Sequence, residues 1–176
     1  MSTTDPVYPG LSKAILFAIR AYGSVKRLDG STYLGHALRV ALIIAEELGN
    51  ASEDALILAL LHDSMEESNT TFMDISREFG PIMASYVAIL SKDQVTPEEA
   101  IGQDLLHIPS LKGMALPVRQ VRLADRLDNM RSVSDLPDEH RSQIVTYLRR
   151  SLPVVLELAQ HTNPWFVEAI SSTSLE

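Results

Sequence analysis

The stretch Ala55–Glu67 reads ALILALLHDSMEE, in which seven consecutive apolar residues run directly into an imidazole and three carboxylates. A run of this length fits a buried strand or a buried helix. Asn50 or Ser52 offers an N-cap upstream, and the run consists mostly of alanine and leucine, which favour helix. We therefore expect a helix that is apolar on all sides and lies at the centre of the fold.

The ionisable residues at the end of this run predict a functional site. At helical spacing His62 and Glu66 lie one turn apart, as do Asp63 and Glu67, so that one helix presents all four along one side. Charges at the end of a buried helix cost free energy unless a metal ion or a binding partner compensates them.

Composition limits the class of protein. The chain has 176 residues, 45% of them hydrophobic, and we expect one domain over residues 1–176 with its core at about 11–160. The absence of cysteine fits a reducing compartment, and the lack of a signal peptide or a long apolar run predicts a cytoplasmic protein without a membrane span. The net charge of −8 argues against a nucleic-acid-binding surface.

The remaining pattern is helical throughout. Strand alternation, hairpin signals and internal repeats are missing from the sequence, so we predict an all-α bundle of eight or more helices. Besides the central helix, we expect helices at about 11–24, 33–48, 71–80, 81–90, 97–106 and 116–133, one from about 136 that Pro153 kinks or breaks, and a last one from Asn163-Pro164.

Three of these helices carry polar residues on otherwise apolar faces: His36, the pair His62-Asp63, and Asp125 with Asn129. Two imidazoles and two carboxylates without sulfur form a ligand set for a divalent ion such as Mn, Fe or Zn. Each residue also has an ordinary interpretation. A histidine on an apolar-flanked helix is usually a hydrogen-bonded core residue, and Asp125 has arginine neighbours with which it can pair.

A wider comparison of motifs favours the metal site. The order His36 … His62-Asp63 … Asp125 resembles the H…HD…D pattern of the HD-domain metal-dependent phosphohydrolases. Within them, the local sequences are similar to the hydrolase domain of the RelA/SpoT alarmone enzymes and to the stand-alone small alarmone hydrolases. The stretches that carry this resemblance are Arg27–His36, Ala59–Glu67, Phe79–Gly80 and Val121–Arg131, and it extends over roughly residues 11 to 150.

The resemblance implies an HD-domain helical bundle that hydrolyses the 3′-pyrophosphate of purine nucleotide alarmones such as (p)ppGpp and releases pyrophosphate. It assigns metal binding, with Mn²⁺ as the usual ion, to His36, His62, Asp63 and Asp125. The ion would lower the pKa of water and polarise a phosphoryl oxygen, while the pair Glu66 and Glu67 would position and deprotonate the attacking water.

The same resemblance assigns binding of the nucleotide substrate to a second group of residues. Arg27 would pack on the nucleobase and Asn129 would contact the sugar–phosphate end. Arg141 matches a basic position of the family, and Tyr147 aligns loosely with an aromatic one. The arginines at 122, 126 and 131 are either surface residues, which we favour, or a cluster that compensates the substrate's charge.

Two departures from the family pattern leave alternatives open. Glu67 stands where aspartate is usual, and Glu98 falls where stand-alone members carry a basic residue toward the phosphates. The alternatives to a guanosine alarmone hydrolase are an enzyme for adenosine bis-pyrophosphates, (p)ppApp, or another nucleotide, and a nucleotide-sensing module with impaired catalysis. The sequence leaves the purine base, the metal in the cell and the oligomeric state undecided.

Overall fold

The apolar run forms the helix around which the others pack, as predicted. Helix α3 (Glu53–Leu61) begins after Ser52, whose hydroxyl oxygen accepts a hydrogen bond of 3.2 Å from the Ala55 amide. Every residue from Ala55 to Leu61 is buried. In the computed structural model, α3 contacts helices on several sides, so its uniformly apolar surface leaves no side for water.

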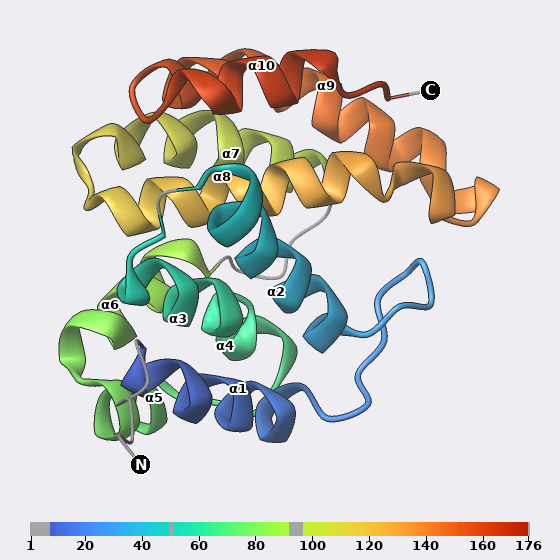
Figure 1. The fold of residues 1–176 in the computed structure, drawn as a ribbon. Helices are drawn as coiled ribbons and strands as arrows, with labels where there is room; N and C mark the ends of the chain where they lie inside the picture. Colours follow the sequence, from blue (N-terminus) through green and yellow to red (C-terminus); the bar gives the residue numbers. More distant parts are fainter. Residues whose placement is uncertain (1–7, 50, 92–96, 176) are drawn as a thin grey trace.

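The structure describes residues 8–49, 51–91 and 97–175 (Figure 1). Within these residues the regular structure is helical, apart from a single β-bridge between Lys26 and Thr32, and the all-α prediction of eight or more helices is confirmed. The other helices are α1 (Pro9–Tyr22), α2 (Tyr33–Leu42), α4 (Ser64–Glu67), α5 (Phe72–Phe79), α6 (Pro81–Leu90), α7 (Pro97–Ser110), α8 (Leu116–Arg131), α9 (Asp138–Gln160) and α10 (Pro164–Ser172).

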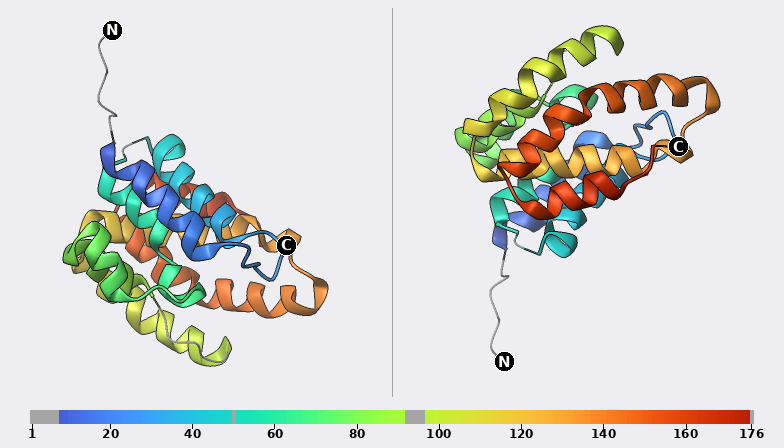
Figure 2. Two further views of the ribbon diagram at one scale, coloured as in Figure 1. Left: turned by 90° about the horizontal axis from the view of Figure 1, so that it is seen from below. Right: turned by 90° about the horizontal axis from the view of Figure 1, so that it is seen from above.

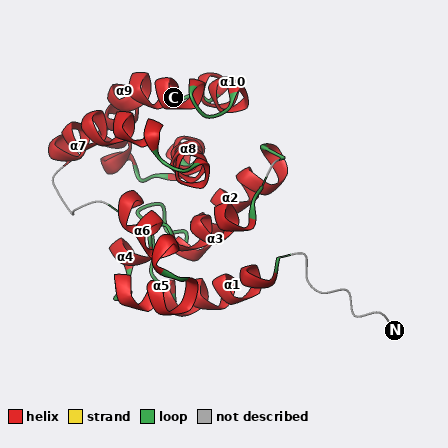
Figure 3. Ribbon diagram, turned by 90° about the vertical axis from the view of Figure 1, so that its left-hand side faces the viewer, coloured by secondary structure: helices red, strands yellow, loops and turns green. Residues whose placement is uncertain are grey.

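The helices lie in layers (Figures 2 and 3). Helices α9 and α10 form one outer layer, α7 and α8 lie beneath them, α2, α3 and α6 follow, and α1 and α5 form the opposite face. Helix α8 contacts both α3 and α9, so it lies between the two halves of the layered structure. The described part of the chain contains no helix with the length and apolar character needed to cross a membrane.

Local signals explain most helix ends. Thr71 and Asp74 form the expected capping box, and α5 ends at Gly80, whose φ of +88° lies where glycine is favoured. Pro81 opens α6, and the Asn163 side chain accepts a hydrogen bond of 2.9 Å from the Trp165 amide at the start of α10. The expected cap of α7 at Thr96 lies outside the described residues.

Three expectations about helix boundaries are wrong. The central helix does not continue to Glu67, because the chain turns at His62 and Asp63, where Asp63 adopts φ −95° and ψ 0°, before the short α4. Helix α7 runs past residue 106 to Ser110. Of the two outcomes expected at Pro153, a kink or a break, the break is wrong: helix α9 continues through this exposed position, where water can take the place of the missing amide donor.

The segment expected at 33–48 changes its winding midway. Helix α2 ends at Leu42, and a π-helical turn over Ile43–Glu47 follows it. The whole segment therefore reaches close to the expected end, and Gly49, with a φ of +68°, ends it.

Candidate metal and substrate site

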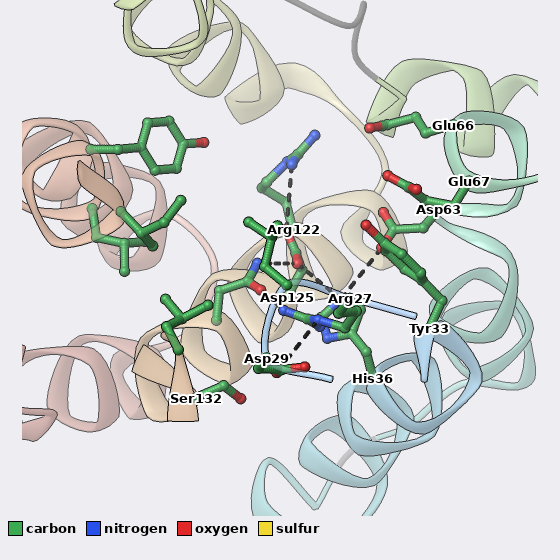
Figure 4. A pocket seen from close by; sticks show the side chains of 16 residues that line it. Arg27, Asp29, Tyr33, His36, Asp63, Glu66, Glu67, Arg122, Asp125 and Ser132 are labelled. Atoms are coloured by element: carbon green, nitrogen blue, oxygen red, sulfur yellow. Dashed lines mark hydrogen bonds and ion pairs between the residues drawn. The ribbon is translucent and has the colours of Figure 1, made fainter. Parts of the chain in front are cut away.

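All but two of the predicted site residues, His62 and Arg141, line one cavity of about 250 Å³ between α2, α4, α8 and α9 (Figure 4). One end of the cavity is polar and the other is lined by apolar side chains of α9 and the segment before it. The lining consists of Arg27, Leu28, Asp29, Tyr33, His36, Asp63, Glu66, Glu67, Arg122, Asp125, Asn129, Ser132, Leu136, Ile144, Tyr147 and Leu148.

The four predicted metal ligands lie together at the polar end. One ligand atom from each of His36, His62 and Asp63 falls within 4.8 Å of the others. The Asp125 Oδ1 atom lies 3.3 Å from His36 Nε2 and 3.9 Å from His62 Nε2. Helices far apart in the sequence thus supply two imidazoles and two carboxylates to one point, which is the set that the ordered motif predicted.

The hydrogen bonds of the two histidines test whether a cation fits. The Nδ1 atom of His62 lies 2.7 Å from the Ala59 carbonyl oxygen, and a carbonyl only accepts, so this nitrogen carries the proton. In the neutral imidazole the lone pair therefore lies on Nε2, which is buried 3.2 Å from Asp63 Oδ1 without an aligned hydrogen bond. A buried lone pair beside Asp63 and Asp125 is the arrangement that a divalent ion satisfies.

The histidines and aspartates of this set shift one another's pKa values, because protonated imidazoles and ionised carboxylates attract each other. Burial lowers the pKa of His62, but the negative charge of Asp63 and its contact with the ring outweigh this and raise it to about 9. The pKa of His36 is also raised, against the effect of burial, by Asp125 and Asp128. Burial opposes ionisation of Asp125, yet the two histidines hold the pKa of that carboxyl well below its usual range.

The turn at His62 and Asp63 determines where the two glutamates lie. Helix α4 begins with hydrogen bonds from the Glu66 and Glu67 amides to the Asp63 carbonyl oxygen, and both side chains line the cavity. Tyr33 donates a hydrogen bond to Glu67. Burial raises the pKa of Glu67, and the charge of Asp63 raises it further, so Glu67 is a stronger base than an exposed glutamate.

The predicted nucleotide contacts are distributed unequally. Arg27, Asn129 and Tyr147 line the cavity. Arg141 does not: its guanidinium donates to the carbonyl oxygens of Ser134 and Leu136 and pairs with Asp138, so it fastens the start of α9 instead of reaching the cavity.

Two further residues singled out in the sequence are Glu98, at the start of α7, and Tyr147 of α9. The side chain of Glu98 lies outside the described part of the structure. The Tyr147 hydroxyl donates to Asp104 and accepts a hydrogen bond of 3.0 Å from Arg126.

Of the three arginines expected at the surface, Arg122, Arg126 and Arg131, the first two are buried, so the expectation is wrong for them. Arg122 and Arg126 are 5% and 3% exposed, whereas Arg131 pairs with Glu47 at the surface. Arg122 lines the cavity, donates to the Leu90 carbonyl oxygen at 2.6 Å, and lies 3.5 Å from Asp125 Oδ2. It therefore places a buried positive charge beside the polar end of the site.

Two polar residues of the site were not predicted. Tyr33 was given no role, although it begins the helix of His36 and lies three residues before it, which places it near that residue. Asp128 lies 2.7 Å from His36 Nδ1, and the sequence signal for it was its spacing of three residues from Asp125 on one buried helix.

Known proteins are similar to this chain in sequence. A family described as "HD domain" matches residues 14–159. The human protein named guanosine-3′,5′-bis(diphosphate) 3′-pyrophosphohydrolase MESH1 is 30% identical over 166 residues, which cover 91% of this chain and 90% of that protein. The GTP pyrophosphokinase rsh of Brucella ovis is 33% identical over 138 residues, or 76% of this chain, and the match spans only 18% of that longer protein.

A solved structure shows the same fold. It is described as "A metazoan ortholog of SpoT hydrolyzes ppGpp and plays a role in starvation responses", and it superposes with a TM-score of 0.78 over 98% of this chain and 96% of that one. The sequences are 22% identical, so this similarity supports the all-α fold and not a particular activity.

Proposed function

The chain belongs to the HD-domain family and is related to SpoT and Rsh hydrolase domains and to the small alarmone hydrolase MESH1, and from this premise we propose that it hydrolyses the 3′-pyrophosphate of purine nucleotide alarmones such as (p)ppGpp. One observation carries the proposal. His36, Asp63 and Asp125, the two glutamates of α4 and the pair Arg27–Asn129 all line a single cavity, and His62 lies beside His36 and Asp63 at its polar end.

The metal centre consists of His36, His62, Asp63 and Asp125, and Mn²⁺ is the ion that we propose. When bound, a divalent ion supplies Lewis-acid chemistry that acidifies water and withdraws electrons from a phosphoryl oxygen. The protein contributes two lone-pair nitrogens and two carboxylates, and buried Arg122 offsets part of the negative charge.

The two glutamates supply the base. Attack of a water oxygen on the phosphorus next to the ribose 3′ oxygen forms one P–O bond, breaks the bond to that 3′ oxygen and leaves pyrophosphate. The water must lose a proton and the 3′ oxygen must gain one. Glu66 and Glu67 line the cavity beside the metal ligands and can accept the first proton. Glu67 is held by Tyr33, so its position is better defined than that of a free side chain.

The cavity also has a place for the nucleoside. Arg27 and Tyr33 are neighbours, with the guanidinium carbon 5.9 Å from the ring centroid, and a planar guanidinium can stack on a base. Apolar side chains of Leu136, Ile144 and Leu148 line the opposite end. A site with charged groups at one end and apolar groups at the other suits a nucleotide with its phosphates toward the metal.

Turnover of a substrate panel tests the proposal. Guanosine and adenosine 3′,5′-bis-pyrophosphates and ordinary nucleoside triphosphates are incubated with metal-free protein, with added Mn²⁺, Mg²⁺ or Zn²⁺, and again after chelation. We expect pyrophosphate and the nucleoside 5′-diphosphate from a bis-pyrophosphate with Mn²⁺, and none after chelation.

Each other result of the panel has a distinct meaning. A preference for the adenosine substrate would change the base but not the reaction. Nucleotide binding without turnover under every metal condition would overturn the proposal in favour of a sensing module. The His62→Ala protein, prepared in parallel, controls for contaminating phosphatases.

A further inference from the structure

A carboxylate of α8 lies between one of the proposed metal ligands and an arginine of α2. Asp128 Oδ2 is 2.7 Å from His36 Nδ1, on the side of the ring away from the metal set. Arg39 Nε donates to Asp128 Oδ1 at 2.8 Å and Arg39 Nη2 donates to Oδ2 at 3.0 Å. His36 and Asp128 are buried at 1% and 3% exposure, whereas the Arg39 side chain is 41% exposed.

The chemistry of these groups restricts the orientation of the imidazole. A carboxylate accepts hydrogen bonds and donates none, so Nδ1 of His36 carries a proton, and in the neutral ring that binds a cation the lone pair lies on Nε2. That Nε2 atom is the one that lies 3.3 Å from Asp125 and 3.5 Å from Asp63. The bond to Asp128 thus selects the tautomer that can ligate a cation and stops rotation of the ring.

Arg39 has a matching role toward Asp128. It stands three residues after His36 on α2, so the imidazole and the guanidinium extend from one face of one helix toward the same carboxylate. The two-point contact through Nε and Nη2 holds both carboxylate oxygens in one plane, which a single hydrogen bond would not do. It also compensates a negative charge that would be costly to bury alone.

We propose that Asp128 and Arg39 are positioning residues that hold His36 in its metal-binding tautomer and orientation. The inference rests on the proposed metal site and adds two residues that do not touch the ion. Asp128 also lies 3.8 Å from Arg27 Nη1, so its substitution could disturb the substrate end directly. Arg39 is therefore the sharper test.

Arg131 provides a matched control. It lies in the same outer groove as Arg39 and makes a two-point contact with Glu47 at 2.6 and 2.8 Å. Its side chain is 39% exposed, close to that of Arg39, and its charge also acts on Asp128, but among the described residues it makes no hydrogen bond to His36 or Asp128. Arg39→Gln and Arg131→Gln remove the same charge at similar exposure, and only the first breaks the link to His36.

The sign of the effect separates positioning from simple charge. Removing a positive charge near a cation site should, by long-range attraction, leave cation binding unchanged or tighten it. Loss of a positioning contact weakens it. A weaker affinity in Arg39→Gln therefore has no explanation in net charge, whereas a loss in Asp128→Asn alone would have one.

The experiment measures Mn²⁺ affinity of the metal-free full chain by competition with a chromogenic chelator, independently of turnover. We expect Asp128→Asn to weaken binding by about 10–100-fold, the usual effect of removing such a partner. We expect Arg39→Gln to weaken it several-fold, Arg39→Lys to recover part of the loss, and Arg131→Gln to bind as the wild type does. Circular dichroism confirms that each variant is folded.

A spectroscopic measurement reads the tautomer itself. In protein labelled with ¹⁵N-histidine, at a pH at which the His36 ring is neutral, two-bond couplings show whether its proton is on Nδ1 or Nε2, and we expect Nδ1 in the wild type and a mixture in Arg39→Gln and Asp128→Asn. Wild-type affinity and tautomer in both folded variants would overturn the inference. A wild-type protein that binds no Mn²⁺ or other divalent ion would instead overturn the proposed metal site itself.

Discussion

Arg27 Nη2 donates a hydrogen bond of 2.6 Å to the side-chain oxygen of Asn129, a residue 102 positions further along the chain. The amide nitrogen of Asn129 in turn donates to Asp125 Oδ1 at 2.7 Å. One amide therefore connects the arginine proposed to stack on the nucleobase with a carboxylate proposed to bind the metal. Asn129 therefore holds both the proposed substrate contact and the proposed metal ligand in place.

The first prediction follows from this connection. Asn129→Ala removes one acceptor from Arg27 and one donor from Asp125, and we expect KM for the bis-pyrophosphate to rise by about 5–30-fold, which corresponds to the ~1–2 kcal/mol typical of lost hydrogen bonds. Steady-state kinetics at saturating Mn²⁺ measures the effect. Ser132→Ala, a small change on the same cavity wall, should leave KM near the wild-type value. An unchanged KM in Asn129→Ala would contradict the proposed role.

The second prediction concerns the metal. His62→Ala removes a buried ligand, so we expect the purified variant to lose its divalent ion and its activity, and to lose the increase in melting temperature that Mn²⁺ gives the wild type. Elemental analysis and thermal unfolding with and without Mn²⁺ provide the measurements. His140→Ala, at a half-exposed position of α9, is the matched control. Equal metal content in His62→Ala and the wild type would refute the ligand assignment.

How far the sequence predicts the site can be judged from α3 and its end. The apolar run predicted the central helix, and the ordered histidines and aspartates predicted which side chains meet. The turn at Asp63 was not predicted, because the residues HDSMEE have adequate propensity to continue a helix. The turn instead accompanies the packing of His62 and Asp63 toward α2 and α8. Local preference is a weak signal where tertiary contacts compete with it.

The buried charges of α8 show a second limit. Arg122 and Arg126 are buried because each reaches a specific partner, the Leu90 carbonyl oxygen and Asp104 respectively. Those partners lie on other helices, so neither composition nor periodicity reveals them. The contact between Asp128 and His36 has the same origin: it depends on the register between α2 and α8, which a single sequence does not state.

The third prediction assigns the base. Glu66→Gln and Glu67→Gln keep the shape of each side chain and remove its basicity, and the variant that lacks the true base should lose about 10²–10⁴-fold in kcat while keeping its metal. The sequence names Glu66 and Glu67 as a pair, and the raised pKa of Glu67 makes it at least as strong a candidate as Glu66. Single-turnover rates with metal content measured on the same samples decide between them. Near wild-type kcat in both variants would exclude both residues.

The fourth prediction tests the buried pair Asp104–Arg126, which joins α7 to α8 and orients Tyr147. Arg126→Met removes the guanidinium that pairs with the buried Asp104 carboxylate, so we expect a loss of about 3–5 kcal/mol in the free energy of unfolding. Adding Asp104→Asn should restore part of it. The surface pair provides the control: Arg131→Met should cost less than about 1 kcal/mol. Equal costs for the two arginine variants in urea unfolding would show that the buried pair contributes no more than the exposed one.

The last prediction concerns pH. The pKa of His62 in the metal-free fold is about 9, above the value of about 6.5 in an unfolded chain. A raised folded pKa stabilises the metal-free protein fully below pH ~6.5, and this stabilisation is lost as pH rises through about 9. Metal binding follows the opposite direction, because an ion needs the neutral imidazole and must displace the proton. We expect Mn²⁺ affinity to increase by about tenfold per pH unit for each proton displaced and to level off near pH 9.

Calorimetric titrations of metal-free protein with Mn²⁺ at pH 6.5, 7.5 and 8.5, each in two buffers of different ionisation enthalpy, measure both the affinity and the number of protons released. The carboxylates do not complicate this range, since the pKa values of Asp63 and Asp125 are lowered and both stay ionised. His161→Ala removes an exposed imidazole of α9's C-terminal end and should leave the pH profile unchanged. A ligand that is protonated in the metal-free fold cannot bind an ion without losing its proton. A constant affinity from pH 6.5 to 8.5 with no proton release would therefore show that the ion does not bind at His62.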